Sequence, residues 1–205
     1  MNKIMYRFED DTDEQKEDDA KDEKANKPMM ERLMDARTVT IFGEINMKVA
    51  QKVTQQLLML ESISDEEDIK LFINSPGGHV ESGDTIFDMI RYIKPRVKII
   101  GTGWVASAGA LIYAAAPKED RFSLPNTRYL LHQPMGGAMG QASDIAIEAE
   151  EILKMRERLN RTFAKQTGQP FEKVEKDTDR NFWMSAKEAK EYGLVGQIIN
   201  SADEL

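Results

Sequence analysis

Residues 69–78 read IKLFINSPGG, and this pattern predicts a strand that ends in a glycine turn. The apolar run Ile69–Ile73 is typical of a buried strand, and the Asn-Ser-Pro-Gly-Gly run at 74–78 breaks it. Beyond the turn, the stretch from Ser82 to Ile93 places its apolar residues at helical spacing. A buried strand that leads through a turn into a helix is the building unit of an α/β sheet.

The same alternation continues on both sides of this unit. Upstream, Val39–Phe42 predicts a strand, and residues 46–61 predict a helix that begins at Asn46. Downstream, Val97–Ile100 predicts a strand that is followed by a loop at 101–104. Further elements are expected at Met29–Arg37 (helical turn), from near Ser107 (helix of small residues), at Arg128–Leu131 (strand), Ala142–Thr167 (helix ended by Gly168), Ser185–Tyr192 (helix ended by Gly193) and around Val195–Ile199 (strand). The sequence therefore predicts one α/β domain over residues 29–205.

The first 28 residues differ in composition from the rest of the chain. They hold 10 acidic and 6 basic residues and few apolar ones after Phe8. Such a stretch cannot bury enough surface to offset the entropy lost on ordering, so we expect residues 1–28 to form a disordered acidic tail. An interaction arm is the alternative.

The composition of the 205 residues excludes several classes of protein. A net charge of −8 argues against nucleic-acid binding, which needs clustered positive charge. With no cysteine and only two histidines, His79 and His132, we expect no metal site and no thiol nucleophile. The longest apolar stretch, Val105 to Ala116, is shorter than the roughly 20 residues of a membrane span, and the N-terminus turns acidic where a signal peptide is apolar. We therefore expect no membrane association and a cytoplasmic protein.

The helix expected at Ala142–Thr167 is unusually long for the domain. At about 1.5 Å per residue it would measure about 39 Å, which is more than a sheet of this size needs for cover. Its apolar stripe therefore suggests a surface for a partner, and the stripe consists of Ile145, Ala149, Ile152, Leu159 and Phe163.

Two places in the chain suggest the chemistry of acyl transfer. Ser107 opens a helix of small residues, which would place its hydroxyl at the positive end of that helix. The glycine pair at 77–78 leaves backbone N–H groups free of side chains, as an oxyanion site requires. Each has a simpler alternative: a serine at a helix start is most often an N-cap, and a glycine pair most often makes a plain turn.

The histidines and carboxylates are ambiguous when each is taken alone. His132 ends the strand expected at Arg128–Leu131, where a buried histidine is the simpler interpretation, and His79 is expected to be a partly exposed turn residue. Together, however, Ser107, His132, the glycine pair and a polar residue near 180 supply a nucleophile, a base, oxyanion donors and an orienting group.

Four stretches of the chain carry a resemblance to a known family. They are FINSPGGHVESG (72–83), GTGWVASAGA (101–110), RFSLPNTRYLLHQPMGGAMGQASDI (121–145) and EKDTDRNFWMSAKEAKEYGLV (175–195). With the spacing between them, they resemble the proteolytic subunit of the ATP-dependent Clp protease over roughly residues 39–200.

This resemblance implies a serine endopeptidase with the crotonase-like ββα fold, in which the stretch 136–140 and the helix from Ala142 form a protruding helix-strand handle. It implies Ser107 as nucleophile, His132 as general base, and the backbone N–H groups of Gly78 and Ala108 as oxyanion donors. It also implies two stacked seven-membered rings, an AAA+ ATPase that unfolds the protein substrates, and no cofactor of its own, since the ATPase uses the ATP.

The chain departs from the family at the third position of the triad. The family has an aspartate where this chain has Asn181, in the run DTDRN at 177–181. An asparagine can orient an imidazole but cannot stabilise the imidazolium, and in a chymotrypsin-type triad this exchange lowers turnover by about 10⁴-fold. Asp177 and Asp179 are alternative orienting groups.

Two further departures concern selectivity and docking. His79 stands where the family has a small apolar residue beside the oxyanion turn, which predicts altered selectivity near the scissile bond. The run at 29–37 replaces the family's usual approach to the first strand. The resemblance implies that this region shapes the axial entrance and helps to contact the ATPase ring, so this departure concerns docking and not the fold.

Three functions follow from these observations. The first is a Clp-type proteolytic subunit that hydrolyses proteins delivered by the ATPase. The second is a weakly active, structural or regulatory subunit in a mixed ring with a more active paralogue, which Asn181 motivates. The third, an acyl-CoA enzyme that uses the same fold and oxyanion site, is disfavoured by the pairing of Ser107 with His132.

Overall fold

The computed structural model describes residues 27–137 and 139–205 of the chain. The acidic tail expected at 1–28 lies outside these ranges except for its last two residues, so it stays a prediction, as does the domain boundary at 29. The chain divides into two units, one that ends at Ala36 and one that comprises residues 37–205. In the first unit, helix α2 (Met29–Asp35) confirms the helical turn expected there.

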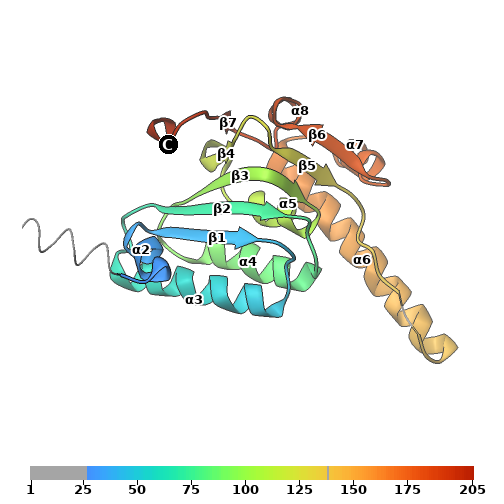
Figure 1. Ribbon diagram of the computed structural model, residues 1–205. Helices are drawn as coiled ribbons and strands as arrows, with labels where there is room; N and C mark the ends of the chain where they lie inside the picture. The colour runs from blue at the N-terminus through green and yellow to red at the C-terminus, as the bar shows by residue number, and fades with distance from the viewer. Residues whose placement is uncertain (1–26, 138) are drawn as a thin grey trace, which may run out of the picture. The chain divides into compact units, whose positions relative to one another are not determined.

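A sheet of seven strands forms the centre of the second unit (Figure 1). Its main path runs β1-β2-β3-β4-β7, with all neighbours parallel, and β5 and β6 extend from β3, with β6 antiparallel to β5. The strands are β1 (Thr38–Phe42), β2 (Ile69–Ser75), β3 (Val97–Ala106), β4 (Arg121–Ser123), β5 (Arg128–Leu131), β6 (Phe182–Ser185) and β7 (Gln197–Ile198). The predicted α/β class is therefore confirmed.

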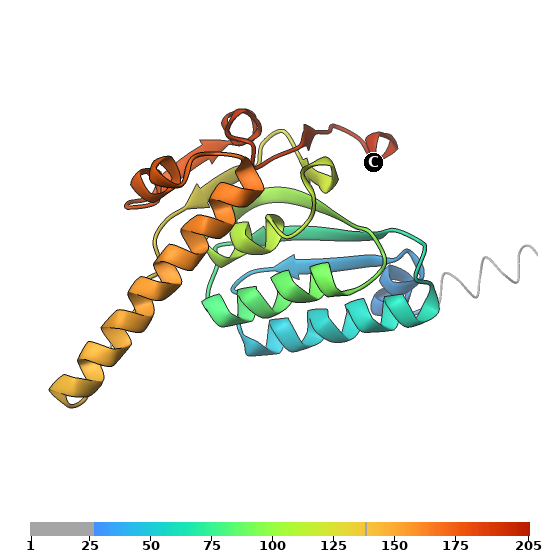
Figure 2. The same cartoon turned by 180° about the vertical axis from the view of Figure 1, so that it is seen from behind.

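Three helices cover one face of the sheet (Figure 2): α3 (Met47–Ile63), α4 (Val80–Tyr92) and α5 (Ala108–Tyr113). Asn46 caps α3 as expected, because its side chain accepts hydrogen bonds from the N–H groups of Lys48 and Val49 at 3.0 and 3.1 Å. The apolar side chains between helices and sheet, such as Leu57, Ile73, Ile86 and Ile99, are fully buried. Their removal from water is the main source of the stability of this unit.

Helix α6 (Ala142–Thr167) begins and ends where the sequence predicts, with Gly168 in the left-handed conformation after it. Its C-terminal half is fixed to the domain by the buried Leu159 and Phe163, and by Arg158, whose guanidinium donates to both carboxylate oxygens of Asp84 at 2.7 Å. The N-terminal half extends past the sheet (Figures 1 and 2).

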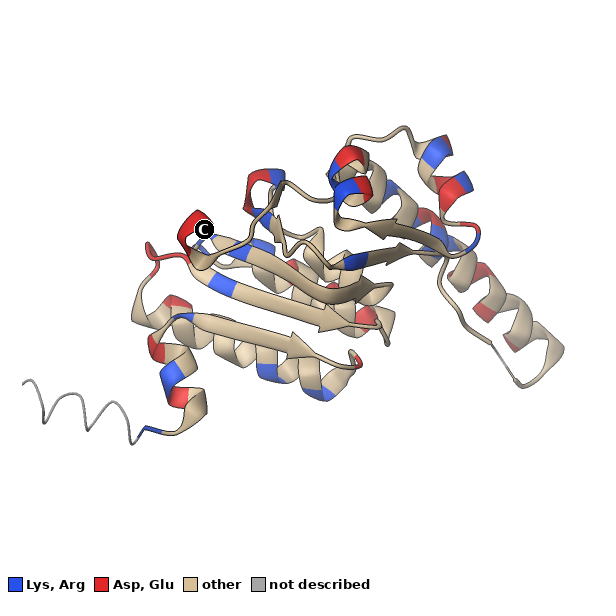
Figure 3. Cartoon of the chain, turned by 45° about the horizontal axis from the view of Figure 1, so that its top comes forward, with Lys and Arg blue, Asp and Glu red and all other residues tan. Residues whose placement is uncertain are grey.

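The charges of α6 are divided along its length (Figure 3). Four acidic residues and one lysine lie in the N-terminal half: Asp144, Glu148, Glu150, Glu151 and Lys154. Four basic residues and one glutamate lie in the C-terminal half: Arg156, Arg158, Arg161, Lys165 and Glu157. This order is favourable for the helix dipole.

The prediction of a loop at 101–104 is wrong, because β3 continues through these residues to Ala106. The two halves of β3 have different neighbours: residues 99–101 pair with β4 and residues 104–106 with β5. Between them the pairing with β2 shifts in register after Ile73, and Gly103 takes a positive φ of 62°. Gly101 and Gly103 therefore mark a bulge inside the strand and not the end of the strand.

The strand half of the expected handle is also not found. Residues 132–137 and 139–141 run beside α6 without strand pairing (Figure 1), so α6 alone gives the protruding part its regular structure. A strand needs a neighbouring backbone to accept and donate its hydrogen bonds, and nothing within the described part of this chain lies there to do so.

Several short elements escaped the sequence analysis: β4, β6, α7 (Phe171–Asp177) and the 3₁₀ helices η1 (Lys118–Asp120) and η2 (Ala202–Glu204). The final helix α8 (Ala186–Tyr192) was expected, with Ser185 and Glu188 forming its capping box and Gly193 ending it in the left-handed conformation. The strand expected around Val195–Ile199 is confirmed in shorter form by β7.

Candidate active site

Ser107 lies between the last residue of β3 and the first residue of α5. Its φ is +55° and its ψ is −122°, a conformation that residues other than glycine rarely adopt. Its backbone N–H donates to the carbonyl of Leu130 in β5 at 2.9 Å, and its hydroxyl makes no helix-capping hydrogen bond. Ser107 therefore occupies the N-cap position of α5 without capping it through its side chain, and it stands on a strained strand-to-helix turn of the kind that presents a nucleophile.

The glycine turn after β2 packs directly against Ser107. A Cβ atom on Gly77, where φ is +100°, would lie 2.6 Å from the Cβ of Ser107. Gly78 is fixed by a bridge to the segment before α3, in which the N–H of Ile45 donates to Gly77 and the N–H of His79 donates to Ile45. Only glycine fits at both positions, so the close approach of this turn to the serine depends on the glycine pair.

Two backbone amides at this turn are available to a ligand. No described residue accepts a hydrogen bond from the N–H of Gly78. The N–H of Ala108 begins α5, where a helix has no internal acceptor for it. These are the two amides expected as oxyanion donors, and that role stays a prediction.

A small pocket opens beside Ser107. His132 also lines it, so the two candidate residues face one cavity. The remaining lining is almost entirely apolar and comes from α4, α5, the end of β5 and α6: Val80, Ala108, Leu111, Leu131, Pro134, Leu159 and Phe163. The sequence placed Leu159 and Phe163 on the apolar stripe of the long helix but gave no sign that they reach the site.

His132 and Asn181 form the polar pair of the site. The Nδ1 of His132 lies 3.1 Å from the Oδ1 of Asn181. With an amide oxygen at this position, Nδ1 carries the proton and donates it, which leaves Nε2 as the basic nitrogen. Within the described residues no hydrogen bond joins the hydroxyl of Ser107 to His132. The geometry therefore brings the three residues to one place with the serine–histidine contact still open.

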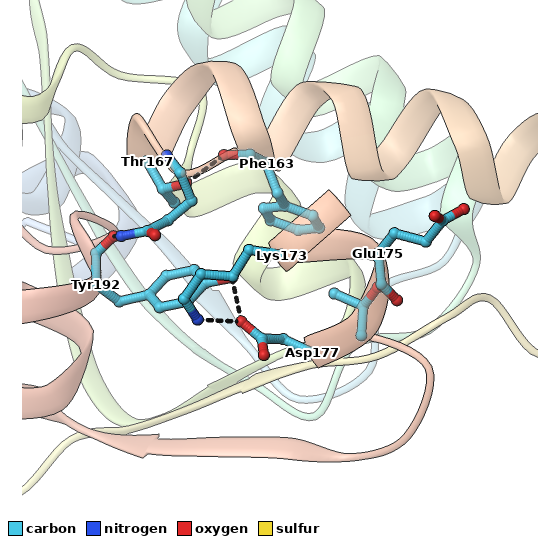
Figure 4. Close-up of polar contacts among 8 residues, drawn as sticks. Phe163, Thr167, Lys173, Glu175, Asp177 and Tyr192 are labelled. Carbon is cyan, nitrogen blue, oxygen red and sulfur yellow. Dashed lines mark hydrogen bonds and ion pairs between the residues drawn. The ribbon is translucent and has the colours of Figure 1, made fainter. Parts of the chain in front are cut away.

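The alternative orienting carboxylates lie elsewhere. Asp177 accepts from the Nζ of Lys173 at 2.6 Å and from the hydroxyl of Tyr192 at 3.0 Å (Figure 4). Burial and this hydrogen bond to Asp177 raise the pKa of Tyr192 far above its usual value. Asp179 pairs with Arg156 of α6 at 3.1 Å. Neither carboxylate bonds to His132, so Asn181 is the residue that the structure places against the imidazole.

His79 is the partly exposed turn residue that the sequence predicts. It precedes α4, with its Nδ1 at 2.9 Å from the hydroxyl of Ser82 and its Nε2 at 3.2 Å from the carboxylate of Glu81. It does not line the pocket beside Ser107. Its effect on selectivity stays a prediction.

Other kinds of site were sought in the same residues. Over 27–137 and 139–205, no three side chains of the metal-ligating types gather in one place. In the same ranges, no helix has both the length and the apolar character needed to cross a bilayer.

Comparison with known proteins agrees with this geometry. The sequence profile of the family described as Clp protease matches residues 20–202. An ATP-dependent Clp protease proteolytic subunit 2 from Gluconobacter oxydans is 63% identical over 197 residues, which cover 94% of this chain and 87% of that protein. An ATP-dependent Clp protease proteolytic subunit 3 from Rhizobium etli is 58% identical over 193 residues, which cover 94% of this chain and 99% of that protein.

Solved structures give the same result. An asparagine-to-aspartate mutant of ClpP1 from Listeria monocytogenes is 59% identical, with a TM-score of 0.80 over 86% of this chain and 98% of that chain. The unmutated ClpP1 of the same organism is 58% identical, with a TM-score of 0.78 over 87% and 99%. The chain therefore belongs to the Clp protease family, and like these relatives it is a proteolytic subunit that acts as a serine-type endopeptidase.

Proposed function

We propose that Ser107, His132 and Asn181 carry out the hydrolysis of peptide bonds in this chain. The oxygen of Ser107 attacks the peptide carbonyl while Nε2 of His132 takes the hydroxyl proton, and the N–H groups of Gly78 and Ala108 bind the oxyanion. His132 then gives the proton to the leaving amine, and the C–N bond breaks to leave an ester on Ser107. Water, deprotonated by His132, hydrolyses the ester and restores the serine.

The observation that carries this proposal is the pocket shared by Ser107 and His132. Its apolar wall predicts that the residue before the scissile bond is apolar, because a charged side chain would lose its hydration there without gaining a partner. The hydroxyl of Ser107 has to turn toward Nε2 before reaction, and such contacts often tighten only when substrate binds.

The substrates and partners follow from the relatives. Their names describe subunits of an ATP-dependent protease, so we propose that an AAA+ ATPase delivers unfolded proteins to this chain and that the chain itself needs no cofactor. We further propose that it assembles into two stacked heptameric rings. Unpartnered apolar side chains on the projecting segment support assembly: Met135, Met139, Ile145, Ile147 and Leu153. The cytoplasmic location stays a prediction.

A second candidate function is favoured by one specific feature of the site. A neutral amide in place of a carboxylate leaves the imidazolium of His132 without a counter-charge. This supports a subunit of low activity that works in mixed rings with a more active paralogue.

Hydrolysis of short fluorogenic peptides by the purified chain tests the proposal. We expect the wild type to cleave peptides with an apolar residue before the scissile bond, and Ser107→Ala to be inactive at the same assembly state. If wild type is silent alone and becomes active in mixed assemblies through its own Ser107, the second candidate holds. Equal activity of wild type and Ser107→Ala would rule out the proposed mechanism.

A further inference from the structure

Gln133 follows His132 directly and precedes Pro134. A proline disfavours helical backbone in the residue before it, and Gln133 lies in neither a helix nor a strand, so its backbone and side-chain amides can bond to other segments. The backbone amide and the side-chain amide of Gln133 both donate to one neighbouring segment, residues 178–179. Its backbone N–H donates to the carbonyl of Thr178 at 2.7 Å, and its side-chain Nε2 donates to the carbonyl of Asp179 at 2.6 Å.

The segment that accepts these two hydrogen bonds, residues 178–179, leads to Asn181. The carbonyls of Thr178 and Asp179 lie three and two residues before it in the chain. Both hydrogen bonds therefore connect Gln133, the neighbour of His132, to the residues that precede Asn181. The paired ladder of β5 and β6 ends at Leu131 and Phe182, so no strand pairing holds these two loops together beyond that point.

Side chains of α6 hold the same segment, residues 178–179, through two further contacts. The hydroxyl of Thr178, which is buried, donates to the Oδ1 of the buried Asn160 at 2.9 Å. Arg156 holds the carboxylate of Asp179 at 3.1 Å. The segment is thus fixed to the helix, and Gln133 is the link between that fixed segment and His132.

We propose that Gln133 is a positioning residue for the candidate triad: its side-chain amide keeps Asn181 opposite His132, so that the imidazole stays in the tautomer with the proton on Nδ1. The proposal rests on the proposed function of His132 as base. The link matters more here than in a triad with a carboxylate, because a neutral hydrogen bond is weaker than a charge-assisted one and orients the ring less firmly.

The tautomer of His132 provides a direct readout. The chain has only two histidines, so ¹⁵N-histidine spectra of the full chain contain two rings, and His79→Gln assigns them. Gln133→Met keeps the side-chain length and removes the donor. We expect wild type to hold His132 with the proton on Nδ1 and Gln133→Met to shift it toward the Nε2 form. An unchanged tautomer in Gln133→Met would overturn the proposal.

Gln169→Met is the matched control. The Nε2 of Gln169 also donates to a backbone carbonyl, that of Tyr192, at 3.0 Å, but it makes no contact with the site. The same substitution should leave the tautomer of His132 as in wild type. Should Gln133→Met fail to fold, Gln133→Asn repeats the test, because its shorter side chain cannot reach Asp179.

Kinetics provides a second readout through the rate at which a fluorophosphonate labels Ser107. We expect Gln133→Met to slow labelling about fivefold to tenfold, and to slow it less than about twofold when Asn181→Leu has already removed the orienting amide. If Gln133→Met slows labelling by the same factor with and without Asn181→Leu, Gln133 acts on stability alone, and the proposal is overturned. A tautomer that shifts as expected in a chain whose Ser107 is never labelled would instead contradict the proposed function.

Discussion

His132 and Asn181 face each other one step beyond the last pair of the β5–β6 ladder. In that antiparallel ladder Leu130 pairs with Trp183 and Leu131 with Phe182, so the next opposed positions are 132 and 181. The 3.1 Å contact between Nδ1 and Oδ1 occupies this place. The register of two short strands therefore decides which residue lies against the imidazole, and the nearby carboxylates at 177 and 179 are out of register for that place.

Asn181→Asp should raise the activity of the chain. A carboxylate at this place stabilises the imidazolium that forms when His132 takes the proton from Ser107. The reverse exchange in a chymotrypsin-type triad costs about 10⁴-fold, and we expect a gain on the order of 10²-fold in kcat. The measurement is kcat on a fluorogenic peptide at matched assembly state. An unchanged or lower kcat in a correctly assembled variant would contradict this expectation.

Gly77→Ala should inactivate the chain, whereas Gly43→Ala should not. Both glycines have a positive φ, of 100° and 84°, so both variants carry a backbone strain of about 1 kcal/mol. Only at Gly77 would the new Cβ press on Ser107, because nothing lies within 4 Å of a Cβ at Gly43. Peptide hydrolysis should fall by more than about 10²-fold in the first variant alone. Similar losses in both would show that contact with Ser107 is not the cause.

Ser107→Gly should be more stable than Ser107→Ala. At φ +55° and ψ −122° a Cβ is strained, and glycine relieves a strain of about 1–3 kcal/mol. The greater freedom of glycine in the unfolded chain offsets about 0.5–1 kcal/mol of this, so a net gain of about 1 kcal/mol remains. Thermal unfolding of the two variants at one protein concentration measures the difference. A higher Tm for Ser107→Ala would mean that the turn is not strained.

The raised pKa of Tyr129 should lower the free energy of unfolding at alkaline pH. The side chain is fully buried, and this burial raises its pKa from about 10 to about 12. Below pH 10 the phenol is neutral in both the folded and the unfolded chain. Between pH 10 and 12 only the unfolded chain loses the proton, so the free energy of unfolding falls with pH, by about 3 kcal/mol in all.

Tyr129→Phe removes this contribution from Tyr129. Urea unfolding of wild type and Tyr129→Phe at pH 9 and pH 11 therefore measures it, since the stability of the variant should fall less over that interval. Tyr192, whose pKa is also raised, remains in both proteins and cancels in the comparison. Tyr113 does not cancel fully, because the neighbouring Tyr129 contributes to its raised pKa, so the measured difference contains this coupling as well. Parallel losses in the two proteins would contradict the assignment to Tyr129.

The sequence predicted the long elements of the fold well. Continuous apolar runs marked β1 and β2, and caps such as Asn46 and Gly168 marked the ends of helices. The short elements β4, β6 and α7 were missed because three to seven residues give too little periodicity, and their formation depends on neighbours distant in the chain. The equally short α8 was predicted because Ser185 and Gly193 mark its two ends. The bulge at Gly103 was taken for a loop because a glycine inside a strand resembles a turn when only the local sequence is considered.

The candidate site was predicted in its residue types but not in its contacts. Ser107, His132 and the glycine pair were identifiable from their places at the ends of strands and turns. The strained φ of Ser107, the pocket wall from α6 and the link through Gln133 were not. Each of these depends on segments that are far apart in the sequence and meet only in the folded domain.

The most direct test of the central claim is the site at which a fluorophosphonate modifies the chain, located by mass spectrometry in wild type, Ser107→Ala and His132→Ala. The account predicts modification of Ser107 in wild type, none in Ser107→Ala, and a strongly reduced rate in His132→Ala. Modification of a different residue in wild type, or Ser107 labelled at the same rate without His132, would contradict it.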